Sequence, residues 1–138
     1  MFFTNIERDT LDNDNYRKTV YTDNFFQLVL MSLKPKENIH REAHVNGDQF
    51  IRIEQGECKI ITDEKTIFMK KDDACIIPSK TYHEVVNIGI VDLKLYTLYS
   101  PPQHSNELKQ HDKPIQECEQ LSDNDCIRKY AKYQNKNI

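Results

Sequence analysis

Imidazole and carboxylate side chains gather in one short stretch of the sequence, His40-Arg41-Glu42-Ala43-His44. If this stretch is an extended strand, the alternation of side chains puts His40, Glu42 and His44 on one face. Such a row is costly to bury without a cation, because every lone pair needs a partner. The stretch is therefore either part of a metal site or a solvent-exposed strand.

A second group of the same kind lies further along the chain, in the run from Thr81 to Asn87. Alternation there places His83 and Asn87 on one face and directs Tyr82 and Glu84 to the other. Imidazole and carboxylate together suit Zn, Fe, Mn, Ni or Cu, with no strong preference among them. The spacing alone leaves open whether these histidines bind a metal or lie on the surface of strands.

Both stretches lie in a series of short runs rich in β-branched and aromatic residues, between Val20 and Tyr99. The longest run covers residues 25–33, and the next ones cover 48–54, 57–62, 66–69, 74–77, 81–88 and 93–99. Several short strands at this spacing, with turn residues between them and no clear helical pattern, predict an all-β sandwich or barrel. Pro101-Pro102 ends the last strand, because proline cannot donate to a strand pairing.

Composition divides the chain into three parts. Residues 1–15 form a polar N-terminal leader, 16–102 the β-barrel domain and 103–138 a polar C-terminal tail. Within the tail, Ser122-Asp123 can cap a short helix, so we expect the tail to be a short helix on the barrel or partly disordered. His104 and His111 fall in this tail and are predicted to be solvated.

Length and charge limit the classes of protein to which the chain can belong. Its 138 residues suit one domain and are too few for two. A net charge of −3 lacks the basic footprint that nucleic-acid binding needs. No apolar run approaches the roughly 18 residues of a membrane span, and the start lacks the features of a secretory signal. We therefore expect a cytoplasmic protein with no nucleic-acid or membrane partner.

The four cysteines show no spacing typical of a metal finger or a redox pair; they are Cys58, Cys75, Cys118 and Cys126. In a cytoplasmic protein we expect them to be reduced rather than joined in disulfides. Cys58 and Cys75 lie in apolar runs and are predicted to belong to the core.

The histidine-containing stretches resemble the two motifs of the cupins, a family of small β-barrel or jelly-roll proteins. Five of the ten motif positions match literally, namely His44, Gly56, Pro78, His83 and Asn87. The other five differ: Lys36, Asp72 and Lys80 stand where glycine is usual, Glu42 where the first histidine is usual, and Gln49 where glutamate is usual. The spacing is kept across both motifs, over roughly residues 19–102. The resemblance implies an all-β, cupin-type β-barrel or jelly roll, also called a double-stranded β-helix.

Within this family, the chain is similar to small single-domain cupins that are often labelled mannose-6-phosphate isomerase-like. That branch tends to carry Glu and Gln at the two altered positions, which implies a variant site rather than a decayed one. Carried over position by position, the resemblance implies a metal held by Glu42, His44, Gln49 and His83. The metal would be a divalent transition ion, Zn, Fe, Mn or Ni, with open positions for water or substrate. His40 is not at a usual ligand position and would support a ligand or contact the substrate.

Three functions follow as alternatives from the resemblance. The first is a metal-dependent enzyme acting on a small molecule inside the barrel. It would be a sugar or phosphosugar isomerase, with Glu42 as ligand or catalytic base and Lys80 holding a phosphate, or a dioxygenase if the metal is iron. The second is a non-catalytic module that binds a metal or a sugar, and the third keeps the fold but has lost the metal. We also expect a homodimer, joined by edge strands or by outward-facing residues such as Phe50.

Overall fold

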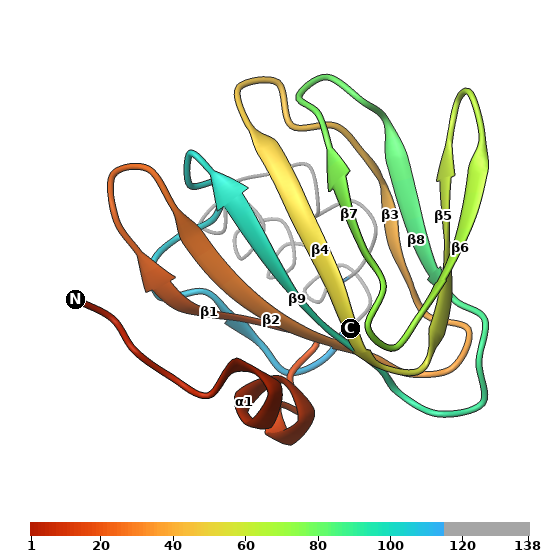
Figure 1. The fold of residues 1–138 in the computed structure, drawn as a ribbon, viewed down its shortest axis with the longest axis horizontal. Coiled ribbons are helices and arrows are strands. Elements are labelled where there is room, and N and C mark those ends of the chain that lie inside the picture. The colour runs from red at the N-terminus through yellow and green to blue at the C-terminus, as the bar shows by residue number, and fades with distance from the viewer. Residues whose placement is uncertain (115–138) are drawn as a thin grey trace, which may run out of the picture.

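One short helix and ten strands make up the part of the chain that the computed structural model describes, residues 1–114 (Figure 1). The helix is α1 (Ile6–Asp12), and the strands are β1 (Arg17–Thr22), β2 (Gln27–Leu33), β3 (Asn38–Glu42), β4 (Asp48–Gln55), β5 (Glu57–Thr62), β6 (Thr66–Lys70), β7 (Ala74–Ile77), β8 (His83–Asn87), β9 (Leu93–Ser100) and β10 (Lys109–Gln110). Within these residues, no helix is long and apolar enough to cross a membrane.

The strands form two antiparallel sheets that curve around a shared core (Figure 1). The larger sheet has the order β10-β1-β2-β9-β4-β7, and the smaller one has the order β3-β8-β5-β6. The core takes Val29, Ile51 and Leu95 from the larger sheet and Ile60 and Val85 from the smaller one. The all-β barrel fold predicted from the sequence is confirmed, and most strands lie within a few residues of the predicted runs.

Two elements lie outside the predicted barrel domain of residues 16–102. Helix α1 lies in the leader, where the side chain of Asn5 caps it by accepting from the backbone N–H of Arg8 at 3.0 Å. Strand β10 lies in the predicted tail and pairs with β1, so the chain continues to add to the larger sheet after β9. The helix predicted after Ser122-Asp123 lies outside the described residues.

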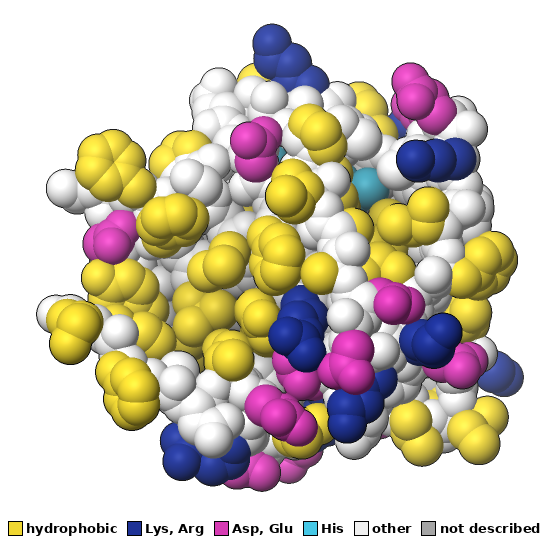
Figure 2. All heavy atoms as spheres, in the orientation of Figure 1, with side chains coloured by type: hydrophobic (Ala, Val, Ile, Leu, Met, Phe, Trp, Pro, Cys, Tyr) yellow, Lys and Arg dark blue, Asp and Glu magenta, His cyan; other side chains and the backbone are white. Residues whose placement is uncertain are grey.

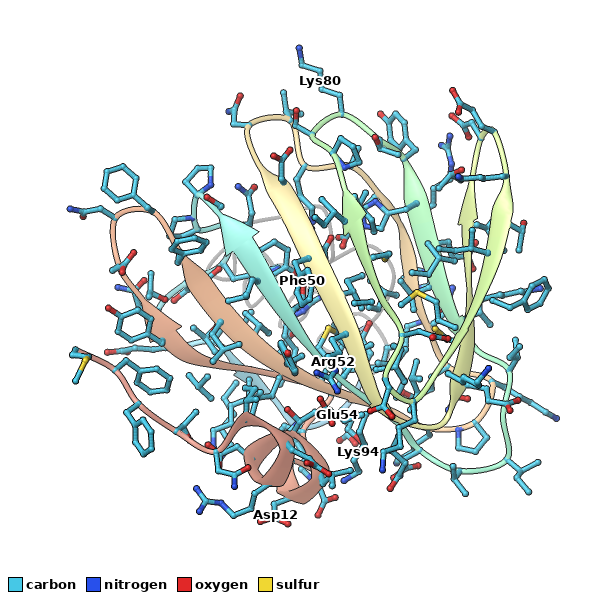
Figure 3. All side chains as sticks on the ribbon, in the orientation of Figure 1. Asp12, Phe50, Arg52, Glu54, Lys80 and Lys94 are labelled. Atoms are coloured by element: carbon cyan, nitrogen blue, oxygen red, sulfur yellow. The ribbon has the colours of Figure 1, made fainter. Side chains whose placement is uncertain are left out.

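A buried lysine fastens α1 to the barrel. Lys94 on β9 is 6% exposed. Its ammonium donates to the carbonyl oxygens of Leu11 (2.8 Å) and Asn13 (2.9 Å) and to Oδ1 of Asp14 (3.0 Å). These three acceptors satisfy all three N–H groups, and a cation is favourable at a helix C-terminus. Figure 3 shows Lys94 at the foot of the larger sheet, beside the end of α1.

Within residues 1–114, three non-glycine residues adopt a left-handed backbone conformation, and all three lie in turns. They are Lys36 (φ 71°), Asp72 (φ 74°) and Lys80 (φ 65°). These are the three positions at which the resemblance led us to expect glycine. The backbone therefore keeps the conformation that favours glycine although the side chain has changed, at a steric cost that is largest for the two lysines.

We expect Lys80→Gly to stabilise the protein by about 0.5–1 kcal/mol, because glycine reaches a positive φ without a clash of Cβ. Lys80→Val should destabilise it by about 1–2 kcal/mol, because a β-branched residue fits this region worst. Urea unfolding of both variants measures the difference. Lys71→Gly serves as the control and should only destabilise, because Lys71 has no positive φ to relieve. Equal stability of the two Lys80 variants would contradict this explanation.

The two cysteines within the described residues are free thiols, as predicted. Cys58 is fully buried, and Cys75 is half-buried and packs against the core. Burial raises the pKa of Cys58 to about 12 and that of Cys75 to about 11. Both thiols are therefore protonated at neutral pH and poor nucleophiles. Cys118 and Cys126 lie outside the described residues.

Candidate metal centre

Glu42 and His44 reach the inside of the barrel because β3 contains a bulge. In the pairing of β3 with β8, Ile39 lies opposite Val85 and Glu42 opposite His83, with a shift of register between them. On a regular strand Ile39 and Glu42, three positions apart, would face opposite sides. An extra residue on one strand reverses the alternation, so that both face inward. The prediction that His40 shares this face was therefore wrong. The Nδ1 atom of His40 instead lies 3.4 Å from the Asn38 side chain.

His83 begins β8, where its buried ring is held in one tautomer. The burial of β8 alternates, so that His83, Val85 and Asn87 face inward, as predicted. The Nδ1 atom of His83 lies 2.9 Å from the carbonyl oxygen of Thr81. Because a carbonyl oxygen only accepts, Nδ1 carries the proton and donates it, and Nε2 keeps a free lone pair. The ring is thus oriented as in histidines that ligate a metal.

Glu42, His44 and His83 meet at one point inside the barrel. Oε1 of Glu42 lies 3.4 Å from Nε2 of His44 and 3.8 Å from Nε2 of His83. The potential ligand atoms of all three residues lie within 4.8 Å of one another. Both Nε2 atoms are buried and have no hydrogen-bond partner among the described residues. Converging buried lone pairs of this kind are costly unless a cation is present.

The electrostatic surroundings favour a carboxylate and a neutral imidazole at this point. Burial raises the pKa of Glu42, but contact with His44 and the positive charge of Arg17 outweigh it, so that this pKa lies below its usual value. Burial lowers the pKa of His83 below its usual value. Glu42 is therefore ionised and His83 neutral at pH 7. These are the states in which carboxylate and imidazole bind a metal.

Gln49, the fourth predicted donor, lies on β4 and is 2% exposed. Its Nε2 donates to Oγ1 of Thr97 at 3.0 Å and to the hydroxyl of Tyr99 at 3.3 Å, while its buried Oε1 has no partner among the described residues. The Tyr99 ring in turn packs edge-on against His44, with centroids 5.1 Å apart. Tyr99 thus links Gln49 to the cluster, and the amide oxygen is left as an available donor.

These residues fit a divalent transition metal. Two imidazole nitrogens, one carboxylate and one amide oxygen make a mixed donor set. Such a set suits Zn, Fe, Mn or Ni better than Ca or Mg, which prefer oxygen ligands alone. Metal–ligand bonds of about 2.1 Å hold ligand atoms up to about 4.2 Å apart. The observed separations of 3.4 and 3.8 Å lie within that range.

A cavity of the described residues lies beside this cluster rather than on it. Its volume is about 510 Å³, and its lining includes Ile60, Ile77 and Thr81 but none of the three clustered residues. Ile77 pairs with Gln49 across the larger sheet, so the cavity borders the strands that carry the cluster. Lys80 also lines the cavity, but its side chain projects away from the barrel (Figure 3). The structure does not direct the Lys80 ammonium into the site.

His104 is the residue that the sequence analysis missed. It was predicted to be solvated, yet its ring packs against Tyr99 (centroids 5.1 Å apart) and His44 (6.5 Å). Burial, together with the charge of Arg17, lowers the pKa of His104 to about 3. The same prediction was correct for His111, whose side chain is exposed. No local sequence signal separates the two histidines, because both lie in a polar segment.

Comparison with known proteins places this architecture in a family. A family model described as the cupin domain matches residues 29–99. The chain is 44% identical over 108 residues to protein L612 of Acanthamoeba polyphaga mimivirus and 39% identical over 111 residues to YrkC of Bacillus subtilis. Each match covers 75% of this chain, but 68% of L612 and 59% of YrkC.

A solved structure agrees with this result. The crystal structure of BH2720 from Bacillus halodurans superposes with a TM-score of 0.77 at 34% sequence identity. The match covers 80% of this chain and 88% of that chain. At this level of identity and coverage, the similarity extends to the whole barrel rather than to the motifs alone.

Proposed function

Because this chain belongs to the cupin family, we propose that its barrel binds one divalent transition-metal ion. The ligands are Glu42, His44 and His83, with the amide oxygen of Gln49 as a fourth donor. One observation carries the proposal: two buried Nε2 atoms without partners converge on one ionised carboxylate. Four protein donors leave open positions for a water or a small molecule.

The metal, when bound, would supply a Lewis acid that polarises an oxygen atom of the bound molecule. The residues around the metal would orient its ligands. Thr81 holds His83 in the tautomer that ligates, and Thr97 and Tyr99 hold the amide of Gln49. Glu42 contributes the one negative charge of the ligand set. Because it contacts both histidines, the structure favours Glu42 as a metal ligand over Glu42 as a catalytic base.

For the reaction, we propose a small-molecule enzyme of the kind labelled mannose-6-phosphate isomerase-like. The adjoining cavity of about 510 Å³ has room for a sugar-sized molecule. A non-catalytic metal- or sugar-binding module is the second candidate, and iron in the site would favour a dioxygenase. If the protein turns over phosphosugars and a Glu42→Ala variant does not, the protein is an enzyme rather than a non-catalytic binding module.

Metal analysis tests the proposal most directly. We expect protein purified without an affinity tag to contain about one equivalent of a transition metal per chain, as a single site of this type requires. Elemental analysis by mass spectrometry gives both the identity and the amount of the metal. A chain that stays metal-free, and that takes up no Zn²⁺, Mn²⁺, Ni²⁺ or Fe²⁺ when these are supplied, contradicts it.

For assembly, we propose a homodimer through the outer face of the larger sheet. Hydrophobic side chains gather over β1, β2, β9 and β4 on that face (Figure 2). Phe50 and Tyr96 are half-buried there, with ring centroids 6.2 Å apart. A second copy would cover this face with like residues, as expected for a two-fold interface. Light scattering should give twice the chain mass of 16.4 kDa, and a monomer at micromolar concentration would contradict the interface.

A further inference from the structure

The segment that follows β9, residues 101–110 and here called the strap, returns across the barrel and ends in β10. One buried side chain holds its backbone. Oε1 of Gln27 accepts from the N–H groups of Gln103 (3.1 Å) and His104 (2.9 Å), and its Nε2 donates to the carbonyl oxygen of His104 (2.8 Å). Gln27 is fully buried on β2. Gln27 thus holds the backbone of Gln103 and His104 with three hydrogen bonds.

Two further contacts hold the strap. The carbonyl oxygen of Leu108, a buried residue, accepts from the N–H of Thr19 at 2.9 Å. On the other side the strap lies against the turn between β3 and β4. A Cβ atom on Gly47 would come within 2.6 Å of Nε2 of Gln103, so glycine permits this approach. The strap is therefore packed on the barrel and not a loose connection.

The strap places one buried polar side chain beside the metal centre. The ring of His104 contacts the rings of His44 and Tyr99, and its Nε2 is buried without a hydrogen-bond partner among the described residues. Leaving such an atom unpaired is costly. Two hydrogen bonds to Gln27 nevertheless hold the backbone of His104 in place. A group that is fixed but unpaired in this way is suited to a ligand that arrives later.

His104 is next to the metal ligands but not one of them. The potential ligand atoms of Glu42, His44 and His83 lie within 4.8 Å of one another, and His104 is not part of that group. Its ring nevertheless packs against the ring of His44, so His104 lies beside the clustered ligands.

We propose that His104 hydrogen-bonds through Nε2 to the small anion or polar molecule that occupies an open position of the metal. This inference rests on the metal site proposed above. The positive charge of Arg17, which is 3% exposed, acts on both the carboxylate of Glu42 and the ring of His104. The ligand class is a small carboxylate or a similar anion, bound between the metal and the strap.

Azide binding to the cobalt-loaded protein tests this contact. Co²⁺ reports its coordination in the visible spectrum, and azide is a small anion that takes an open position. The variant His104→Phe keeps the ring contacts but loses Nε2. We expect it to bind azide about tenfold more weakly, because one hydrogen bond to the anion is lost. Its affinity for Co²⁺ should change less than threefold. His104→Gln should restore part of the azide affinity, because its amide can donate from a similar position.

Two further variants complete the test. His111→Phe changes an exposed histidine in the segment that follows and should leave azide binding unchanged. His104→Leu serves as the apolar variant if the phenylalanine variant does not fold. If the wild type binds Co²⁺ and the apolar variants bind azide as tightly as it does, the inference is wrong and the metal site stands. If the apolar variants lose Co²⁺ itself, His104 is a ligand and the inference is also wrong. If the wild type binds no Co²⁺, the proposed function and the inference both fall.

Discussion

Replacing His83 by alanine should lower the affinity of the protein for Zn²⁺ by about 100-fold or more. The loss of a group that merely supports a ligand costs 10–100-fold, and His83 supplies the donor atom itself. Its tautomer is fixed by Thr81, and the cluster within the described residues holds no histidine besides His44 and His83. Competition with a chromogenic chelator measures the affinity.

The variant needs two controls because His83 is also part of the packed interior, at 1% exposure. His83→Leu fills the volume and should lose Zn²⁺ as completely as the alanine variant, which separates ligation from packing. His40→Ala removes a histidine from the strand of Glu42 that lies outside the cluster, and it should bind Zn²⁺ like the wild type. Retention of Zn²⁺ by both His83 variants would rule out the site.

Gln49→Glu should have two opposite effects. With metal present, the added charge should raise the affinity for Zn²⁺ about tenfold or more, because a carboxylate binds a cation better than an amide does. Without metal, the variant should lose about 1–3 kcal/mol of stability, since a second buried carboxylate would lie close to Glu42. The hydroxyls of Thr97 and Tyr99 can rotate to donate to the new carboxylate, so local packing is kept.

Urea unfolding with and without Zn²⁺ shows both effects at once, as a larger gap between the two curves than in the wild type. Gln55→Glu is the matched control. It makes the same change at the other end of β4, where Gln55 donates to the carbonyl oxygen of Asp92 at 2.9 Å. That variant should leave the Zn²⁺ affinity unchanged. A lower Zn²⁺ affinity in Gln49→Glu would show that the amide oxygen does not face the metal.

The sequence predicted the strands well because alternation is a local property. The inward position of His83 and the outward position of Tyr82 followed from a period of two residues, and both agree with the structure. The same rule failed at His40, because a bulge changes the count. Where a bulge falls depends on how a strand pairs with its neighbour, and His40 and Glu42 alone carry no sign of it.

His104 could not be predicted for a related reason. Its place depends on Gln27, a residue 77 positions earlier in the chain. Local polarity indicates an exposed tail, and only the folded barrel brings the two together. The short helix α1 is a different case, since Asn5 and the acidic residues that follow it are a recognisable start signal. Its seven residues are too few to show a hydrophobic period.

The buried Lys94 determines where this domain begins as a folding unit. The family match starts at residue 29, but the acceptors of Lys94 belong to residues 11–14. Helix α1 also contacts β2, β4 and β9. A fragment cut to the family match would retain most of the strands but uncover this end of the larger sheet, next to a face that is already rich in hydrophobic side chains (Figure 2). Such a fragment would tend to aggregate, so the domain boundary for expression lies before Asn5.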